Sequence, residues 1–345
     1  MRADESGIGL QHLEALPRIP VRHVDSIAAF EAIVVAEQPV VIAGALEHWP
    51  ALAAGRNSAA AMNEYLKSMD AGAFAEVLEA SPQTRGRFFY TPDLRGFNFS
   101  HRRRRVPETL DQLLRSLGEP GAPFVAIQSL PLANHLPEFM RSNPAPFLPA
   151  NVLPRLWVGG AVCTQTHHDP EHNLACVIAG RRRFLLFPPE QVGNLYVGPI
   201  DKPFPPPLSL VDPTAPDYER FPRFRQALQA ARIAHLDAGD AIFMPKYWWH
   251  HVTSLAPYNV LVNYWWGNDA RGLERPLECF LTALLAIKHL PPGERAYWRA
   301  MFDTHIFGDD PVAHIPVALQ GLLGKLDPQL RARLKQQLRL TYLKS

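Results

Sequence analysis

The segment CTQTHHDPEHNLACVIAGRRRFLLFPP, which runs from Cys163 to Pro189, decides the fold class of this chain. It contains two short, mainly apolar runs, Leu174 to Ile178 and Arg182 to Phe187, and Ala179-Gly180 lies between them. Two runs of this length on either side of a glycine turn are typical of neighbouring antiparallel strands, because glycine accepts the backbone angles of a tight turn. The segment therefore predicts β-structure at the centre of the chain.

The same pattern extends over residues 155 to 266, where turn residues such as Asp237 to Asp240 and Ala256-Pro257 separate most of the runs. A series of this kind predicts a closed barrel or jelly roll. The other runs are Leu156 to Val162, Ala231 to Leu236, Ala241 to Met244, Trp248 to Ser254 and Asn259 to Trp266. A proline-rich insertion after Pro188 interrupts the series, and a helix is predicted at its end, from about Asp217 to Ala230.

Helices are predicted on both sides of this barrel, because apolar residues recur there at helical spacing. The predicted helices are Ser26 to Val35, Ala59 to Met69 and Glu108 to Leu117 before the barrel, and Leu277 to Leu285 and Leu330 to Leu338 after it. Short strands are predicted at Pro39 to Ile42, Arg87 to Tyr90 and Phe124 to Gln128. We therefore expect a mostly β domain with α additions over residues 1–268, with its barrel at about 151–268, and a helical segment over 269–345.

The net charge of +2 over 345 residues gives no general electrostatic reason to expect a nucleic-acid or membrane partner. Residues 1–20 lack a secretory apolar stretch, and no run reaches the roughly 18 apolar residues of a bilayer span, so we predict a cytoplasmic protein. The basic run His101 to Arg105 is interpreted as a solvated loop, and docking of an acidic protein or RNA is the alternative.

Three residues in the barrel have the types and spacing of a metal site. In a strand, His167 and Asp169 would point to the same side, and His250 follows two tryptophans in a distant run. Two imidazoles and one carboxylate bind non-haem Fe(II) on one face of an octahedron. The same His-x-Asp pattern at His23 to Asp25 and His235 to Asp237 lacks this context, so we predict the metal at His167, Asp169 and His250.

The run Arg182 to Phe187 carries a second candidate group. Alternation puts Arg182 on one face with Phe184 and Leu186, so a guanidinium would face an apolar interior. An unpaired buried guanidinium is strongly unfavourable, whereas a bidentate pair with a bound carboxylate offsets its burial. The alternative is that Arg181 to Arg183 form a solvated hairpin.

Three polar side chains, those of Asn173, Asn263 and Thr164, are further candidates to hold a bound carboxylate. Asn173 would otherwise cap a turn, and Asn263 would otherwise satisfy backbone groups. Strict alternation from His167 would turn Thr164 outward, so its role requires a bulge between these two residues.

Several motifs together resemble those of the Jumonji-C oxygenases. They are His167-His168-Asp169, Gly180 to Pro189, Gly239 to Pro245, Trp248 to His251 and Val262 to Trp266. The chain is most similar to the cupin-like branch that includes the asparaginyl hydroxylase of hypoxia-inducible factor, whose insertion contains a segment like Pro216 to Pro222. The resemblance covers about residues 25 to 268.

This resemblance implies a double-stranded β-helix of the cupin type, with Fe(II) bound by His167, Asp169 and His250. It further implies 2-oxoglutarate held at Arg182, where that branch usually has lysine, and hydroxylation of a substrate C–H with O2, succinate and CO2. Trp265 and Trp249 would help to exclude water from the site, and ordinary core packing explains both tryptophans equally well. The C-terminal helices resemble in position the dimerising helices of that branch, which implies a homodimer.

The substrate is expected to be a protein or peptide side chain. Hydroxylation of a free amino acid or another small metabolite is the alternative, and a non-catalytic cupin that binds only a metal or ligand is less favoured. Lysine demethylation is also less favoured, because the sequence has no zinc-binding cysteine cluster beside the barrel.

Overall fold

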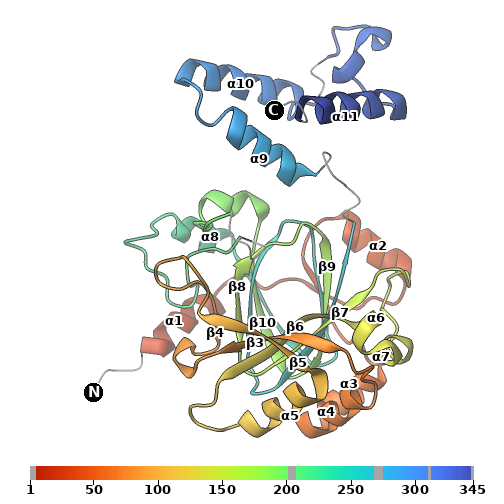
Figure 1. Ribbon diagram of the computed structural model, residues 1–345, viewed down its shortest axis with the longest axis vertical. Helices are drawn as coiled ribbons and strands as arrows, with labels where there is room; N and C mark the ends of the chain where they lie inside the picture. The colour runs from red at the N-terminus through yellow and green to blue at the C-terminus, as the bar shows by residue number, and fades with distance from the viewer. Residues whose placement is uncertain (1–4, 201–206, 268–274, 310–311, 343–345) are drawn as a thin grey trace. The chain divides into compact units, whose positions relative to one another are not determined.

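The computed structural model describes residues 5–200, 207–267, 275–309 and 312–342 (Figure 1). The chain divides into two compact units, Met1–Asn268 and Asp269–Ser345. No helix among the described residues combines the length and the apolar character that a bilayer span requires.

The first unit contains two sheets in which the paired strands are antiparallel except at β1–β2 and β4–β8. The nine-stranded sheet has the order β1 (Val21–Arg22), β2 (Val40–Ile42), β12 (Ala241–Met244), β9 (His172–Ala179), β14 (Asn259–Trp266), β7 (Pro154–Gly159), β6 (Phe124–Pro131), β3 (Phe74–Ala80) and β5 (Phe99–Arg105). The five-stranded sheet has the order β11 (Arg232–Asp237), β10 (Arg181–Phe187), β13 (Trp249–Ser254), β8 (Cys163–His167) and β4 (Arg87–Phe88).

Strands β7 to β14 form the barrel. Successive strands alternate between the two sheets, except that β10 and β11 are neighbours in the five-stranded sheet. This alternation is the connectivity of a jelly roll, so the predicted mostly β barrel with helical additions is confirmed. The strands that the apolar runs predicted are all present, and β12 and β14 have the predicted bounds.

Helices cover the outer faces of the two sheets. Those of the first unit are α1 (Glu5–Glu14), α2 (Ile27–Val35), α3 (Pro50–Asn57), α4 (Ala59–Lys67), α5 (Val106–Ser116), α6 (Leu132–His135), α7 (Pro137–Ser142) and α8 (Phe224–Ala230). Figure 1 shows α3, α4 and α5 together at one end of this unit. Two of these helices begin at a serine cap: Ser26 Oγ accepts from Ala29 N in α2, and Ser58 Oγ accepts from Ala61 N in α4.

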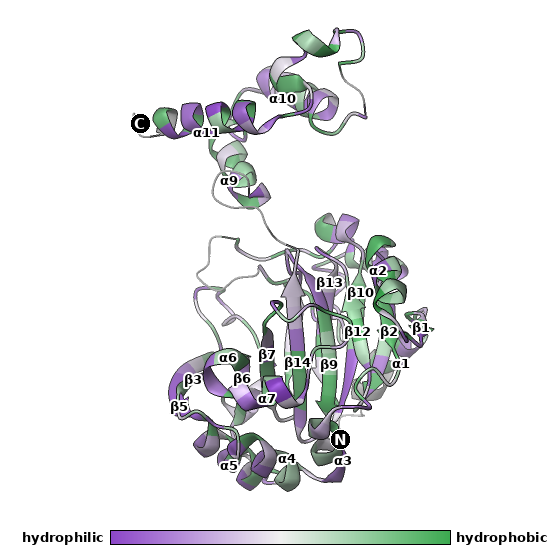
Figure 2. Ribbon diagram, turned by 90° about the vertical axis from the view of Figure 1, so that its right-hand side faces the viewer, coloured by the Kyte–Doolittle hydropathy of each residue, from purple (hydrophilic) through white to green (hydrophobic). Residues whose placement is uncertain are grey.

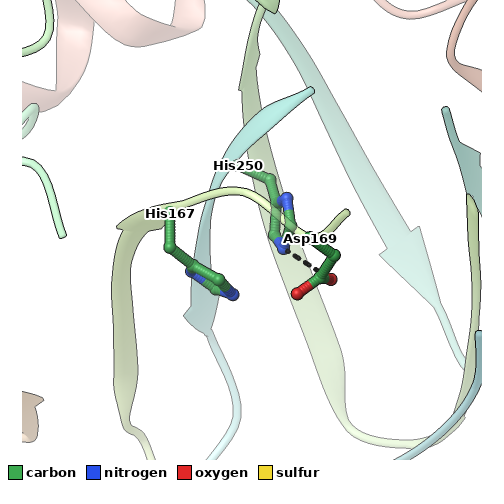
Figure 3. A group of neighbouring side chains, drawn as sticks. All are labelled: His167, Asp169 and His250. Carbon is green, nitrogen blue, oxygen red and sulfur yellow. Dashed lines mark ion pairs between the residues drawn. The ribbon is translucent and has the colours of Figure 1, made fainter. Parts of the chain in front are cut away.

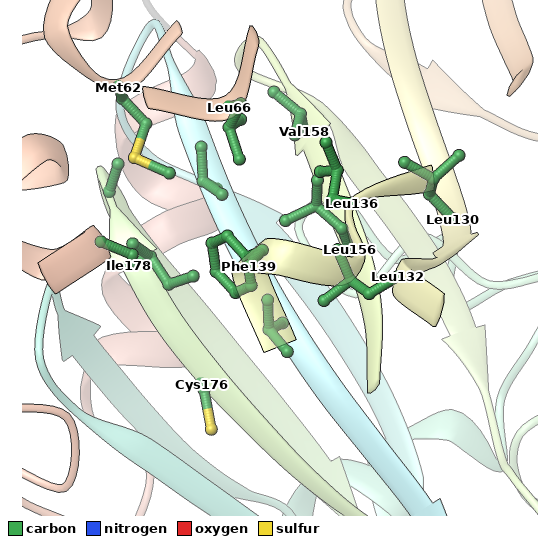
Figure 4. Close-up of a cluster of buried hydrophobic side chains, with 14 of the residues drawn as sticks. Met62, Leu66, Leu130, Leu132, Leu136, Phe139, Leu156, Val158, Cys176 and Ile178 are labelled. Atoms are coloured by element: carbon green, nitrogen blue, oxygen red, sulfur yellow. The ribbon is translucent and has the colours of Figure 1, made fainter. Parts of the chain in front are cut away.

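Of the four buried apolar clusters among the described residues, three follow this layering. The outer face of the nine-stranded sheet packs on α2 to α7, for example through Leu156, Phe139 and Met62 (Figure 4). The outer face of the five-stranded sheet packs on α1 and α8. The third core lies between the two sheets and includes Phe184 and Leu261. Figure 2 colours the central strands β9 and β12 mostly as hydrophobic, which agrees with their burial on both faces.

Two sequence predictions about secondary structure are wrong. Arg102 to Arg105 lie in strand β5 and not in a loop, because β5 pairs with β3 along its length and Arg105 stacks over the Phe74 ring. The predicted helix from Asp217 begins only at Phe224, since the Asp217 carboxylate caps a separate turn and Pro222 has no N–H to donate.

The turn between β9 and β10 requires glycine. Gly180 has φ +77°, and a Cβ atom there would lie 2.4 Å from Asn259 Oδ1 and 2.5 Å from the Tyr258 carbonyl oxygen. We expect Gly180→Ala to lower the free energy of unfolding by about 2 kcal/mol or more, because a left-handed non-glycine residue costs roughly 1–2 kcal/mol before any clash. Urea denaturation measures this loss.

Gly118 provides the matched control for this prediction. It has the same φ of +77°, and nothing lies within 4 Å of its added Cβ. Gly118→Ala should therefore lower the free energy of unfolding only by the cost of the left-handed backbone conformation. If both variants lost the same free energy of unfolding, the steric argument for Gly180 would be contradicted.

The second unit consists of the helices α9 (Pro276–Ala286), α10 (Pro292–His305) and α11 (Pro328–Tyr342) together with short 3-10 turns. Large apolar side chains remain exposed on α9 and after α10, among them Leu277, Leu285 and Phe307.

Candidate metal centre

Three of the predicted site residues converge inside the barrel. His167 ends β8, Asp169 lies in the loop that follows, and His250 lies in β13 directly opposite His167 in the strand register. One ligand atom from each residue lies within 4.8 Å of the others (Figure 3). In the described part of the chain, no other group of three histidine, cysteine, aspartate or glutamate side chains has this arrangement.

The tautomers of both histidines favour metal binding through Nε2. His167 Nδ1 lies 2.8 Å from the carbonyl oxygen of Gln165, and His250 Nδ1 lies 3.0 Å from that of Trp248. A carbonyl oxygen only accepts hydrogen bonds, so each Nδ1 carries a proton, and in the neutral form of either ring the lone pair lies on Nε2. Burial, and then the neighbouring His250 imidazole, lower the pKa of His167 to about 4, so this ring is neutral at pH 7.

The Asp169 carboxylate is oriented by two donors. Trp265 Nε1 donates to Asp169 Oδ2 at 3.0 Å, and Asn173 Nδ2 donates to the same oxygen at 3.1 Å. Burial alone would raise the pKa of Asp169, but the two imidazoles and these hydrogen bonds together lower the pKa below its ordinary value. The carboxylate is therefore ionised and held in place, as a metal ligand requires.

A chain of hydrogen bonds continues from Asp169 into the barrel. Asn263 Nδ2 donates to Asn173 Oδ1 at 3.4 Å, and Trp157 Nε1 donates to Asn263 Oδ1 at 2.7 Å. The sequence analysis missed Trp157. An indole N–H that points into a barrel needs an acceptor, and the alternation of Trp157 with the outward residues of β7 was the available signal.

Arg182 lies in the same cavity as the triad. Its residue exposure is 7%, and its Nε has no hydrogen-bond partner among the described residues. Burial lowers the pKa of Arg182 to about 10, so the guanidinium stays charged at pH 7. A buried cation without an anionic partner fits a site for the carboxylate of a ligand. Because Arg182 and Arg183 are both buried, the solvated-hairpin alternative is wrong for these two residues.

All eight predicted site residues line one cavity. It is bounded by Thr164, His167, Asp169, Asn173, Arg182, His250, Asn263 and Trp265, together with Trp157 and apolar residues of both sheets. Thr164 reaches this cavity because three steps along β8, from His167 to Thr164, match two steps along β13, from His250 to Val252. This irregularity is the bulge that the Thr164 assignment required.

Trp249 is not among the residues that line the cavity, so of its two predicted roles the structure favours core packing over water exclusion. It precedes His250 on β13, so alternation turns it outward into the core beneath α8. There its ring meets that of His168 edge to face, with ring centroids 4.6 Å apart. Trp249 therefore packs the fold and does not exclude water from the metal centre.

The Trp265 contact gives a testable outcome. We expect Trp265→Phe to weaken divalent-metal binding about tenfold, because outer partners of ligating carboxylates typically contribute 10–100-fold. Mn(II) titration followed by EPR measures the change. Trp266→Phe is the control, since that ring packs against His172 and Phe243 on the other face of β14. Equal affinities for the two variants would contradict the orienting role of Trp265.

The barrel topology defines a cupin-type fold, and its internal cavity holds a two-histidine, one-carboxylate triad that could bind a metal ion. Comparison with known families agrees, because the Cupin-like domain family matches residues 26–272. The chain therefore belongs to the Cupin-like domain family. The predicted closeness to the asparaginyl hydroxylase branch stays a prediction.

Three relatives show partial similarity to this chain. The chain is 38% identical over 128 residues to "Lysine-specific demethylase JMJ31" of Arabidopsis thaliana, covering 36% of this chain and 23% of that protein. It is 38% identical over 147 residues to human "HSPB1-associated protein 1", covering 41% and 30%. It is 36% identical over 124 residues to "Jumonji C domain-containing protein 5" of Drosophila melanogaster, covering 34% and 28%. The matches span less than a third of each relative.

Proposed function

We propose that this chain is an Fe(II)- and 2-oxoglutarate-dependent oxygenase that hydroxylates a C–H bond of a protein or peptide side chain. The observation that carries the proposal is the cavity shared by His167, Asp169, His250 and the buried cation Arg182, whose Nε has no hydrogen-bond partner among the described residues. Two imidazoles, one carboxylate and open coordination positions are the donor set of non-haem Fe(II) oxygenases.

Each residue has a distinct task in this proposal. His167 and His250 would bind Fe(II) through Nε2, and Asp169 would bind it through its carboxylate. Arg182, with help from the Thr164 hydroxyl, would pair with the far carboxylate of 2-oxoglutarate. When bound, Fe(II) would supply activation of O2, with oxidative decarboxylation of 2-oxoglutarate to succinate and CO2 providing the electrons. The apolar walls of the cavity would keep water away from these groups.

A polypeptide substrate is supported by the names of two relatives, one a lysine-specific demethylase and one an HSPB1-associated protein. Demethylation uses the same site chemistry on an N-methyl carbon, and its product then releases formaldehyde. Product analysis separates the possibilities: a gain of one oxygen atom indicates hydroxylation, and formaldehyde indicates demethylation. Turnover with free amino acids but no peptide would favour the small-metabolite alternative.

The central experiment is anaerobic addition of Fe(II) and 2-oxoglutarate to the full chain. We expect a visible charge-transfer band, and then succinate when O2 is admitted. A protein that binds the metal and 2-oxoglutarate yet never forms succinate would be a non-catalytic cupin. Absence of both signals would overturn the oxygenase proposal.

Homodimerisation through the C-terminal unit is part of the same proposal. Its support is the exposed apolar residues of α9 and α10, such as Leu281 and Trp298, because exposed apolar patches mark interaction surfaces. We expect light scattering to report a dimer for the full chain and a monomer after deletion of residues 270–345. An unchanged mass after deletion would exclude this interface. The cytoplasmic location stays a prediction, which cell fractionation would test.

A further inference from the structure

His251 directly follows the proposed metal ligand His250 in β13, so its side chain points to the opposite, outward face of the strand. It is 2% exposed, and its imidazole contacts two side chains of the neighbouring strand β8. His251 Nε2 lies 3.1 Å from Cys163 Sγ, and His251 Nδ1 lies 3.4 Å from Thr166 Oγ1. One buried ring thus joins β13 to β8 at two points.

These two contacts bracket the bulge in β8. The register pairs His167 with His250 and Thr164 with Val252, so two residues, Gln165 and Thr166, lie opposite the single residue His251. A bulge of this kind leaves its extra residue without a partner in the ladder, so side-chain contacts must favour it over regular pairing. His251 supplies such contacts from β13.

The insertion holds the bulge from the other side. The backbone N–H of Ser209 donates to the Thr166 carbonyl oxygen at 2.9 Å. The side-chain amide of Gln165 donates through Nε2 to the carbonyl oxygens of Ser209 and Val211, at 2.9 and 2.7 Å. Of the side chains that contact the bulge, His251 is the one on β13, the strand that carries the proposed metal ligand His250. It therefore couples the position of β8 to that of His250.

The bulge matters because it allows both Thr164 and His167 to line the cavity. In a regular strand, residues three positions apart point to opposite faces, so without the bulge one of these side chains would leave the cavity. The outward contacts of His251 thus determine which β8 side chains face the metal.

We propose that His251 is a positioning residue for the metal centre, which fixes the β8 bulge through Cys163 and Thr166 and so holds His167 opposite His250. This inference rests on the proposed function, because it assumes a metal at the triad. It adds a residue on the far side of the strand, which itself contacts neither metal nor substrate.

The test is Mn(II) binding, measured by EPR on the full chain without 2-oxoglutarate, so that its readout does not depend on turnover. His251→Phe keeps a planar ring but removes both contacts, and we expect at least about a tenfold loss of Mn(II) affinity. His251→Gln places an amide near the Nε2 position and can again meet Cys163, so it should recover most of the loss. Urea denaturation checks that each variant is folded.

Ile233→Val is the control for a general loss of stability, because Ile233 is buried in the same outer core on β11. It should bind Mn(II) like the wild type. His251→Phe binding within twofold of the wild type, or His251→Gln losing as much as His251→Phe, would overturn the positioning role. A wild-type chain that binds no Mn(II) would instead remove the proposed function itself.

Discussion

Replacing Asp169 with alanine is expected to abolish succinate formation and the charge-transfer band, and to weaken divalent-metal binding by more than about a hundredfold. The carboxylate is the one anionic ligand of the proposed triad. Hydrogen bonds from Trp265 and Asn173 orient it toward the two histidines. Losing even an outer partner of a ligand typically costs 10–100-fold, so losing the ligand itself should cost more. Anaerobic titration with Fe(II) and 2-oxoglutarate, followed by admission of O2, measures both effects.

His168→Ala is the matched control, because His168 lies between two proposed ligands in the sequence but packs against Trp249. It should keep both the band and succinate release. If Asp169→Ala retained succinate formation within tenfold of the wild type, the assignment of the triad would be wrong.

Replacing Arg182 with methionine should weaken 2-oxoglutarate binding by about two to three orders of magnitude while leaving metal binding intact. Breaking a buried charge pair costs roughly 3–5 kcal/mol, and about 1.4 kcal/mol corresponds to tenfold in affinity. Methionine keeps much of the side-chain volume but removes the cation that faces the cavity. Titration of 2-oxoglutarate into the Mn(II)-loaded protein, read by competition or calorimetry, gives the change in Kd.

Arg182→Met, which weakens 2-oxoglutarate binding, should not destabilise the ligand-free protein. Without a ligand, the Arg182 guanidinium is buried with an unpaired Nε, so methionine should leave the free energy of unfolding unchanged or raise it by ~1 kcal/mol. Adding saturating 2-oxoglutarate should then stabilise the wild type much more than the variant. Urea denaturation with and without 2-oxoglutarate separates the two effects.

Arg183→Met is the control for this pair of measurements. Arg183 is also buried, at 6% exposure, but it faces away from the cavity, with its Nη1 atom 3.9 Å from a Glu14 carboxylate oxygen. It should leave 2-oxoglutarate binding unchanged. Equal losses of affinity in the two arginine variants would contradict the specific role of Arg182.

Two-residue periodicity predicted much of the barrel and of the site. It placed Arg182 on the same face as Phe184, and it placed His167 in the barrel, because the direction of a strand side chain depends only on its position in the strand. The start of the helix in the insertion and the basic strand β5 were predicted wrongly. Arg102 to Arg105 form a strand because β3 lies beside them, and their own composition carries no signal of that pairing.

The sequence by itself determined the barrel, the positions of its strands along the chain and the residue types available for a metal and a carboxylate. Only the tertiary structure decided how these groups meet. The strand register and the β8 bulge turn Thr164 inward, and hydrogen bonds across the barrel join Trp157 and Trp265 to the metal-site network. The physical reason is that alternation is local, whereas register and side-chain hydrogen bonds depend on partners distant in the chain.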